Sequence, residues 1–347
     1  MIKVRIGFIP KSRQNHSMVL LLLFFSAVML LILSFLLSLK VGMARISWHT
    51  IFEALFSGTG NSKEHLYIRT LRLPRAVLAC MVGAQLALAG LLTQIVTKNP
   101  LASPHVFGIN AGASLAVVTG MLLFPAAGLL SSIGLAFAGA MLGALAIWML
   151  SGQGAQQHVM LALAGIAVHF LFASLTEGAM ILNQYNTESM IFWLAGSVNH
   201  ASWQHIQLLA PLLGIVLLLV VLLLPSLRTL ALDDEVAIGL GTRLKGVRAF
   251  AMILVVLLAG SAVAICGPIG FVCLIVPHVA RAMLGSGSSP GVLLTLTMLL
   301  GSILLLLADV MSRLISFPFD SPVGIVMALI GAPVFIYLAR RQGGKGS

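Results

Sequence analysis

The chain has 347 residues, of which 59% are hydrophobic and only 8% are charged, whereas soluble domains are about a quarter charged. Its mean hydropathy of +1.08 excludes an ordinary soluble protein and indicates an integral membrane protein. The formal net charge of +11 comes from cations at the ends of apolar runs and between them. That pattern is typical of membrane topology and argues against nucleic acid as a partner.

Long stretches of the chain carry no charge at all. Neither Asp, Glu, Lys nor Arg occurs between Lys98 and Glu177, or between Glu188 and Arg228. Because a helix crosses the hydrocarbon core in about 20 residues, the first stretch is long enough for several spans. These runs are continuous and rich in Leu, Ala and Gly, so they favour helices over the alternating strands of a barrel. The sequence therefore predicts an all-α integral membrane protein in one domain, residues 1–347.

Apolar runs bounded by glycine and proline predict about ten transmembrane helices. The first run is too long for a cleaved signal peptide, so we expect it to be retained. The third and eighth spans are the shortest. The expected spans are 17–39, 74–95, 106–124, 128–150, 157–182, 206–224, 249–266, 269–284, 291–309 and 322–339.

Two segments between spans are more than connectors. The segment 40–73 contains "ISWHTIFEALFSG", which predicts an amphipathic helix on the membrane surface. The segment 226–247 is polar, and we expect one or two short helices in it. Asp233 and Asp234 suit a helix N-terminus, and Gly239 and Gly241 suit its end.

The distribution of Lys and Arg predicts the orientation. With ten spans both termini share one side, which receives thirteen of the twenty cations, so we place the termini in the cytoplasm. The other seven are therefore expected outside, where positive charge is disfavoured and needs a reason: Lys40, Arg45, Lys63, Arg69, Arg72, Arg75 and Arg313.

Six segments, in order and at fitting spacing, resemble the FecCD family of ABC-importer permeases for ferric siderophores, haem and cobalamin. They are "RLPRAVLACMVGAQLALAGLLTQIVTKNPLASPHVFGINAGAS", "LALAGIAV", "LDDEVAIGLG", "GPIGFVCLIVPHVAR", "LLLADVMSRL" and "SPVGIVMALIGAPVFIYL". The resemblance covers roughly residues 69–339. It implies a ten-helix permease of a type II ABC importer in a bacterial cytoplasmic membrane, with a ferric siderophore as substrate.

The resemblance also implies partners. A second permease subunit, the same or a related chain, would pack beside this one in the lipid, two cytoplasmic ATPase subunits would bind below, and a substrate-binding protein would dock outside. The sequence contains no G-x-x-x-x-G-K-[ST] loop; the tail "RRQGGKGS" lacks its upstream glycine and final hydroxyl. We therefore expect no catalytic residue, metal site or bound cofactor in this chain, with ATP and Mg²⁺ used by the ATPase.

In the family, arginines at the outer ends of spans bind acidic residues of the binding protein. The resemblance assigns this docking role to Arg72 and Arg75 of "RLPR" and to Arg313 of "ADVMSR", and Arg69 shares their spacing. Arginine pairs with carboxylates in a bidentate, geometrically specific way. The alternative is that these arginines anchor helix ends to lipid headgroups.

The acidic segment "DDEVAIGLG" matches the family's coupling loop, which sits in a cleft of the ATPase. The resemblance places Asp234, Glu235, Ala237 and Gly241 at this contact. A glycine at the end of a short helix lets the chain turn back sharply. The alternative is an ordinary solvated loop.

Ionisable residues inside a span are candidates for function. His169 and Glu177 lie in the fifth span, which lines the pathway in the family, and Gln157 and His158 lie at its inner end, where the resemblance places a gate.

Other residues have a structural interpretation. Gly108, Gly112 and Ala113 are expected in close helix contacts, and the three cysteines are expected to pack as small apolar groups. The segment "VPHVAR" is expected to be structural or to face the ATPase. Asp320 and Ser321 stand where the family often has Glu-Leu.

Rival functions remain open. An importer of haem or cobalamin would share this fold. An ion-coupled secondary transporter would have inverted repeats and broken helices around an ion site, and a membrane-embedded enzyme would have an HExxH motif or paired carboxylates. The histidines are scattered, without metal-ligand spacing within one span, which disfavours a metal-ion permease.

Overall fold

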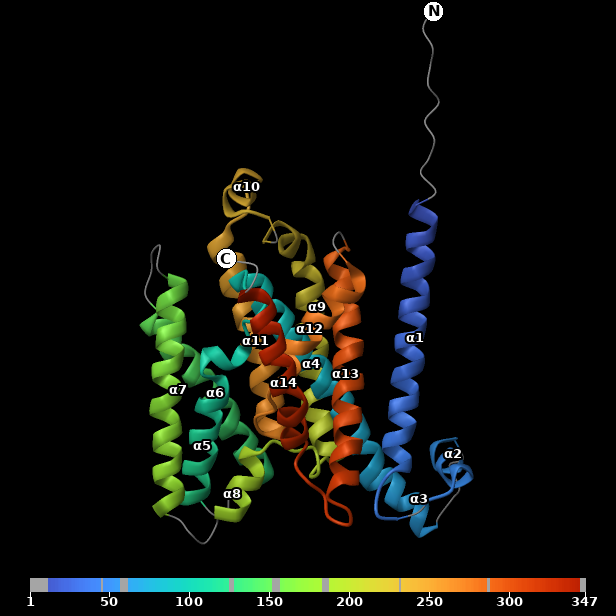
Figure 1. Cartoon of the computed structure of the whole chain (residues 1–347). Coiled ribbons are helices and arrows are strands. Elements are labelled where there is room, and N and C mark those ends of the chain that lie inside the picture. Colours follow the sequence, from blue (N-terminus) through green and yellow to red (C-terminus); the bar gives the residue numbers. More distant parts are fainter. Residues whose placement is uncertain are drawn as a thin grey trace, which may run out of the picture.

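The computed structural model describes residues 12–44, 46–56, 62–124, 128–151, 157–182, 187–230, 232–285 and 288–343. Within these residues every regular element is a helix, as predicted (Figure 1). The elements are α1 (Ser12–Lys40), α2 (Trp48–Phe56), α3 (Lys63–Tyr67), the π-helical turn η1 (Ile68–Arg72), α4 (Leu73–Thr97), the 3₁₀ turn η2 (Pro104–Phe107), α5 (Ile109–Leu123), α6 (Leu129–Leu150), α7 (Gln157–Leu182), α8 (Thr187–Leu194), α9 (Trp203–Leu230), α10 (Asp234–Gly239), α11 (Leu244–Cys266), α12 (Val272–Leu284), α13 (Pro290–Ile315) and α14 (Val323–Gly343).

Among the described residues, seven helices are long and apolar enough to cross a membrane. Three shorter apolar helices, within α5, α12 and α14, fall on the third, eighth and tenth predicted spans. The seven and the three together match the ten predicted spans one for one. The third and eighth spans are short because η2 and the Gly-Pro break before α12 replace part of each helix.

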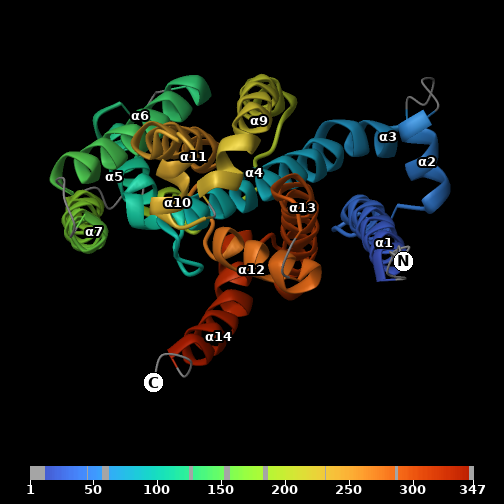
Figure 2. The same ribbon diagram turned by 90° about the horizontal axis from the view of Figure 1, so that it is seen from above.

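The helix α4 is the centre of the bundle. It packs against α9, α11, α12 and α13 (Figure 2). Small residues allow this: a Cβ built on Gly83 would lie 2.4 Å from the carbonyl oxygen of Gly301 in α13, and one on Gly90 would lie 1.9 Å from that of Cys273 in α12. Both approaches are possible only for glycine, which is the usual basis of close helix contact in membranes.

The helices α5 and α6 form a second closely packed pair. A Cβ on Gly112 would lie 2.1 Å from the carbonyl oxygen of Gly139, and one on Gly143 would lie 2.4 Å from that of Gly108. The predicted close contacts at Gly108 and Gly112 are confirmed. The helix α7 lies outside this pair, at the edge of the bundle in Figure 2.

The segment before α4 differs from the prediction. The surface helix expected in 40–73 is present as α2, but residues 63–72, expected as loop, are helical and continue directly into α4. The hydroxyl of Ser62 caps the start of α3 by accepting a hydrogen bond from the His65 backbone nitrogen at 3.2 Å. The next helix breaker, Pro74, lies in the first turn of α4, where proline is tolerated, so nothing interrupts the helix.

Two further boundaries differ. The predicted sixth span ended at 224, whereas α9 continues through Pro225 to Leu230. The segment between the fifth and sixth spans was expected as loop and contains α8, an apolar helix too short to be recognised as a span.

The two ends of the bundle carry different elements. In Figure 1, α1 begins and α14 ends at the end where α10 lies, which we call the α10 end. The helices α2, α3 and α8 lie at the opposite, α2 end. The start of α1, the end of α14 and α10 therefore lie at one end of the bundle, as expected if both termini and the 226–247 segment share one side.

Candidate functional sites

Arg75, one of the predicted docking residues, is buried at the α2 end of α4. Its Nε and Nη2 donate to the carboxylate of Asp309 in α13, with Nη2–Oδ1 at 2.9 Å. Nη2 also donates to the side-chain oxygen of Asn199 at 2.7 Å, and Nη1 donates to Asp320 at 2.5 Å. Asp309 is 0% exposed, whereas the Asp320 side chain is 40% exposed. Arg75 therefore joins α4 and α13 to the segment that precedes α14.

Arg313 shares the same carboxylate. Its Nη2 donates to Asp309 Oδ2 at 2.7 Å, one turn earlier in α13. The guanidinium also donates to the hydroxyl of Ser38 at 2.8 Å and to the carbonyl oxygen of Val41 at 2.6 Å. These bonds fasten the end of α1 to α13, and apolar side chains earlier in α1 pack against α12 and α13.

Arg72, in η1, binds the segment that follows α1. It donates to the carbonyl oxygens of Leu39 and Ala44, both at 2.6 Å, and its guanidinium carbon lies 5.1 Å from the centre of the Tyr67 ring. Arg69 is only half-buried, and its Nε donates to the Ala54 carbonyl oxygen at 2.8 Å. We call Arg72, Arg75, Arg313, Asp309 and Asp320 the arginine cluster.

The cluster is buried but keeps an excess of positive charge. Its arginines are 4%, 8% and 5% exposed, in the order Arg72, Arg75 and Arg313, and three cations face two carboxylates. The sequence placed these arginines together but did not predict their burial. Their donors are engaged within the chain, so docking, which stays a prediction, would require an exchange of partners. The sequence signal for burial was the pair of acids in "LLLADVMSRL" and "DSPVG".

The predicted coupling residues lie at the α10 end. The helix α10 starts after Asp233 and is linked to the bundle through Asp234, which pairs with Lys98 at 2.7 Å and Arg248 at 2.8 Å. Lys98 caps the end of α4 in a left-handed conformation and also donates to the Leu232 carbonyl oxygen. The predicted short helix is therefore present and is attached to α4 and α11.

The outer surface of α10 is apolar and exposed. Val236 and Ile238 of α10 are 52% and 61% exposed, and Leu240, which follows the helix, is 64% exposed, while Ala237 is fully buried against the bundle. Glu235 is exposed as well. Gly241 has a φ of +78° and open space around its Cα, so this residue reverses the chain, as its predicted role requires.

The charge on Asp234 is stabilised by its neighbours. Hydrogen bonds from Lys98 and Arg248 lower the pKa of this carboxyl below its ordinary value. A lowered folded-state pKa means that the link is complete above the unfolded pKa and is lost as the pH falls through the lower folded value. Because the ordinary value is about 3.9, the attachment of α10 is expected to be unaffected by pH near neutrality.

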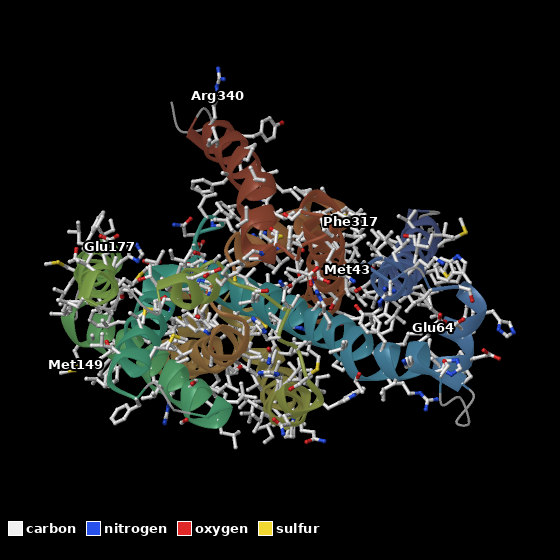
Figure 3. The ribbon with its side chains drawn as sticks, turned by 90° about the horizontal axis from the view of Figure 1, so that it is seen from below. Met43, Glu64, Met149, Glu177, Phe317 and Arg340 are labelled. Carbon is white, nitrogen blue, oxygen red and sulfur yellow. The ribbon has the colours of Figure 1, made fainter. Side chains whose placement is uncertain are left out.

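The predicted pathway residues lie on α7. His169 and Glu177 are both exposed, and Figure 3 shows Glu177 at the outer edge of α7. The side chains of Gln157 and His158 lie outside the described ones. The outward surface of α7 is otherwise apolar, and so is that of α14, which projects from the bundle in Figures 2 and 3.

The "VPHVAR" segment lies in α12, near the α10 end. Arg281 donates to the side-chain oxygen of Gln94 in α4, which supports the structural interpretation of this residue. Cys266 and Cys273 are buried and free, as expected for small apolar groups, and Cys80 is half-buried.

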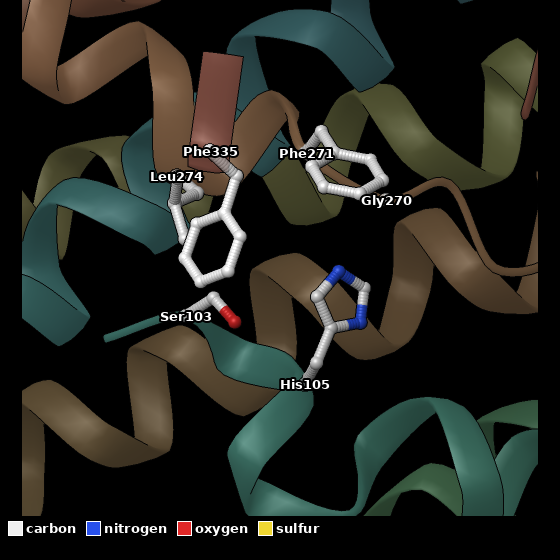
Figure 4. A pocket seen from close by; sticks show the side chains of 6 residues that line it. All are labelled: Ser103, His105, Gly270, Phe271, Leu274 and Phe335. Carbon is white, nitrogen blue, oxygen red and sulfur yellow. The ribbon is translucent and has the colours of Figure 1, made fainter. Parts of the chain in front are cut away.

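A small cavity contains a residue that the sequence analysis did not select. His105 of η2 lines it, together with Ser103, Gly270, Phe271, Leu274 and Phe335 (Figure 4). The cavity volume is about 170 Å³. The sequence signal for this site was weak: a single histidine between two prolines and a glycine.

The fold and these sites define a multi-pass helical membrane protein, and comparison gives its family. The sequence signature of the FecCD transport family matches residues 30–341. The chain therefore belongs to the FecCD transport family, and the resemblance noted from its motifs is confirmed. It is an ABC transporter permease by this membership.

Individual relatives support the assignment. The chain is 43% identical over 330 residues to the Fe(3+)-citrate import system permease protein YfmD of Bacillus subtilis, covering 95% of this chain and 98% of that protein. It is 39% identical over 297 residues to the Fe(3+) dicitrate transport system permease protein FecC of Escherichia coli, covering 84% and 88% of the two chains. A solved metal-chelate type ABC transporter in an inward-facing conformation superposes with a TM-score of 0.79 at 28% identity, over 91% of this chain and 98% of that one.

Proposed function

We propose that this chain is the permease subunit of an ABC importer that carries a ferric siderophore, of the ferric citrate type, into the cytoplasm. The observation that carries the proposal is the family match over residues 30–341 together with 43% identity to a permease named for Fe(3+)-citrate import. Relatives named for siderophore and hydroxamate transport match at 40% and 39% identity. Their shared chemistry is a ferric ion wrapped in an oxygen-rich chelator.

The energy for uptake would come from other polypeptides. Two ATPase subunits would bind ATP and Mg²⁺ at the α10 end, and this chain would transmit their movement. The exposed apolar surface of α10, held to the bundle through Asp234, supports the assignment of α10 as the ATPase contact. In this orientation the α10 end and both termini would lie in the cytoplasm.

A second permease subunit would complete the translocation pathway. The outward apolar surfaces of α7 and α14 support this, because each offers a face that no other described segment covers. Glu177 and His169 would then lie on the pathway side of α7.

A substrate-binding protein would dock at the α2 end, on the arginine cluster. Because the arginines are engaged internally, docking would proceed by exchange. Asp320 is the most exposed partner of Arg75, so an acidic residue of the binding protein could take its place while Asp309 keeps its bonds. The excess positive charge of the cluster favours such an acidic partner.

Uptake into membrane vesicles tests the importer proposal. Vesicles that contain this chain, its partner permease and the ATPase, supplied with ferric-citrate-loaded binding protein outside, should accumulate iron only when ATP is enclosed. Uptake of haem or cobalamin instead of ferric citrate would change the proposed substrate but not the assignment as an ABC-importer permease. Accumulation that needs only a proton or sodium gradient, with the ATPase omitted, would contradict the proposal and favour an ion-coupled secondary transporter.

A further inference from the structure

The cavity beside η2 is formed by three regions that are far apart in the sequence. Ser103 and His105 come from the connection between α4 and α5, Gly270 and Phe271 from the turn before α12, Leu274 from α12 and Phe335 from α14. Figure 4 shows the His105 ring pointing toward the space between Phe271 and Phe335. Three large apolar side chains therefore surround two polar ones.

The imidazole of His105 presents a hydrogen-bond donor to this space. Its Nδ1 is hydrogen-bonded to the amide nitrogen of Asn110. With the Asn110 amide in this orientation, its nitrogen donates to Nδ1, which assigns the ring proton to Nε2. Nε2 is buried and has no partner among the described residues. A buried donor without an acceptor is destabilising, so this geometry calls for an acceptor within the cavity.

The backbone around the cavity is strained in a defined way. Phe271 has a φ of +67°, which is uncommon for a bulky residue and tends to occur at functional sites. Its ring supports α14, because a Cβ built on Gly331 would lie 2.1 Å from the Phe271 Cγ. The close approach of α14 to the start of α12 therefore depends on Gly331 and on the left-handed backbone of Phe271, and the cavity lies beside this contact.

A second histidine lies on the same side of the molecule. The helix α7 packs against η2, where a Cβ built on Gly165 would lie 2.3 Å from the carbonyl oxygen of Val106. His169 is four residues further on, on the same face of α7.

The size and lining of the cavity indicate which kind of ligand group it could bind. Sites that enclose a whole small molecule measure about 300–1,000 Å³, so a cavity of about 170 Å³ holds only one arm of a chelate. Two of its six lining residues, His105 and Ser103, can donate a hydrogen bond, and none of the six is acidic. Such a site favours an anionic oxygen.

We propose that His105 and Ser103 form a pathway subsite that binds a carboxylate arm of the ferric chelate during translocation. This inference rests on the proposed function. A competing occupant is water, which would satisfy the same donor without any role in transport. The two are distinguished by whether the donor is needed for uptake.

The first experiment compares two substitutions of His105 in the vesicle assay with ferric citrate. His105→Leu keeps the volume but removes the donor, so uptake at saturating binding protein should fall about tenfold, as expected for losing a hydrogen bond to a charged group. His105→Gln places an N–H near the position of Nε2 and should retain most of the uptake. ATP hydrolysis and docking of the binding protein should be unchanged in both variants.

A matched control is available in α4. Gln85 is also buried without a partner among the described residues but does not line the cavity, so Gln85→Leu should transport normally. Wild-type uptake by His105→Leu would overturn the subsite and assign the cavity to water. Failure of the unmodified importer to take up ferric citrate with ATP would instead contradict the proposed function.

A second readout does not depend on transport. In the purified complex, His105→Cys should react with a negatively charged methanethiosulfonate reagent faster than the wild type, in which Cys266 and Cys273 are buried and the half-buried Cys80 gives the background rate. Added citrate should slow this reaction. A cysteine that stays unreactive, or one that citrate does not protect, would overturn the subsite even if the leucine variant fails to fold.

Discussion

The arginine cluster and α10 are both charged, both lie at an end of the bundle and both match motifs of the family, yet their structures are opposite. The cluster arginines are at most 8% exposed and donate to groups within the chain, whereas α10 exposes Val236 and Ile238 and is attached through the buried Ala237 and the ion pairs of Asp234. The helix α10 can meet a partner as it stands. The cluster can do so only by exchanging one internal contact for an external one.

This difference shows that the position of a motif does not determine its availability. A charge at a membrane-spanning helix end either faces water or is buried with a partner, because an unpaired charge in the bundle would be too costly. The arginine cluster is buried with its partners. Its arginines hold α1, α4 and α13 together and, through Asp320, reach the start of α14. A change at the cluster should therefore affect assembly first, while a change at α10 should affect coupling.

The largest effect is expected from Asp309→Ala. This substitution leaves Arg75 and Arg313 buried without their shared carboxylate, and breaking a buried ion pair in this way costs about 3–5 kcal/mol. We expect the purified protein to unfold at a clearly lower temperature and its yield to fall. Asp309→Asn keeps an acceptor but removes the charge, so its unfolding temperature should lie between those of the wild type and Asp309→Ala. Unfolding of Asp309→Ala at the wild-type temperature would show that the cluster does not hold the bundle.

At the α10 end, Gly241→Pro should separate ATP use from transport. Proline fixes φ near −65°, whereas Gly241 has a φ of +78° and donates its N–H to the Ile238 carbonyl oxygen. We expect ATP hydrolysis and docking of the binding protein to persist while uptake falls about tenfold, which corresponds to about 1.4 kcal/mol. The measurement is iron accumulated per ATP hydrolysed.

The matched control for that prediction is Gly239→Ala. Gly239 has an ordinary φ and open space, so alanine fits and coupling should be normal. If an assembled complex with Gly241→Pro takes up iron as well as one with Gly239→Ala, then Gly241 belongs to an ordinary loop. That result would contradict the assignment of α10 as the ATPase contact.

A smaller effect is expected from Asp234→Asn. The carboxylate pairs with Lys98 and Arg248 near the surface, and exposed pairs contribute about 0–1 kcal/mol. We expect a loss of coupling of a few-fold, without any loss of folding stability. The wild type should show the same loss only below about pH 4, since the pKa of Asp234 is lowered from an ordinary value of about 3.9. A loss of coupling between pH 6 and 8 would mean that another group controls the attachment.

Much of the fold could be predicted because the bilayer imposes simple rules. All ten spans were placed by apolar runs and helix breakers, and α2 and α10 by local patterns. The helical segment 63–72 was missed because its many charged residues are typical of a loop between spans. Only its continuity with α4 and the cap at Ser62 make it helical.

The sites were less predictable because their contacts are not local. Arg75 and Asp309 are 234 positions apart, so no pattern within "RLPR" reveals that this arginine has a buried partner. His105 was missed for a related reason: its cavity is completed by Phe271 and Phe335, which come from distant parts of the chain. By contrast, α10 was predicted well because its start, its end and its turn are all encoded within nine residues, "DDEVAIGLG".

The affinity of the binding protein for the reconstituted complex reports whether an external acid exchanges with Asp320 at Arg75. Asp320→Asn removes the competing charge at the one partly exposed carboxylate of the cluster and leaves Asp309 in place. If an acidic residue of the binding protein replaces Asp320, docking should tighten by about 1 kcal/mol, roughly fivefold. The gain should shrink as salt rises, because screening limits exposed charges to about 8 Å at physiological ionic strength. An affinity that is unchanged or weaker in Asp320→Asn at low salt would contradict the exchange and leave the arginines with a purely structural role.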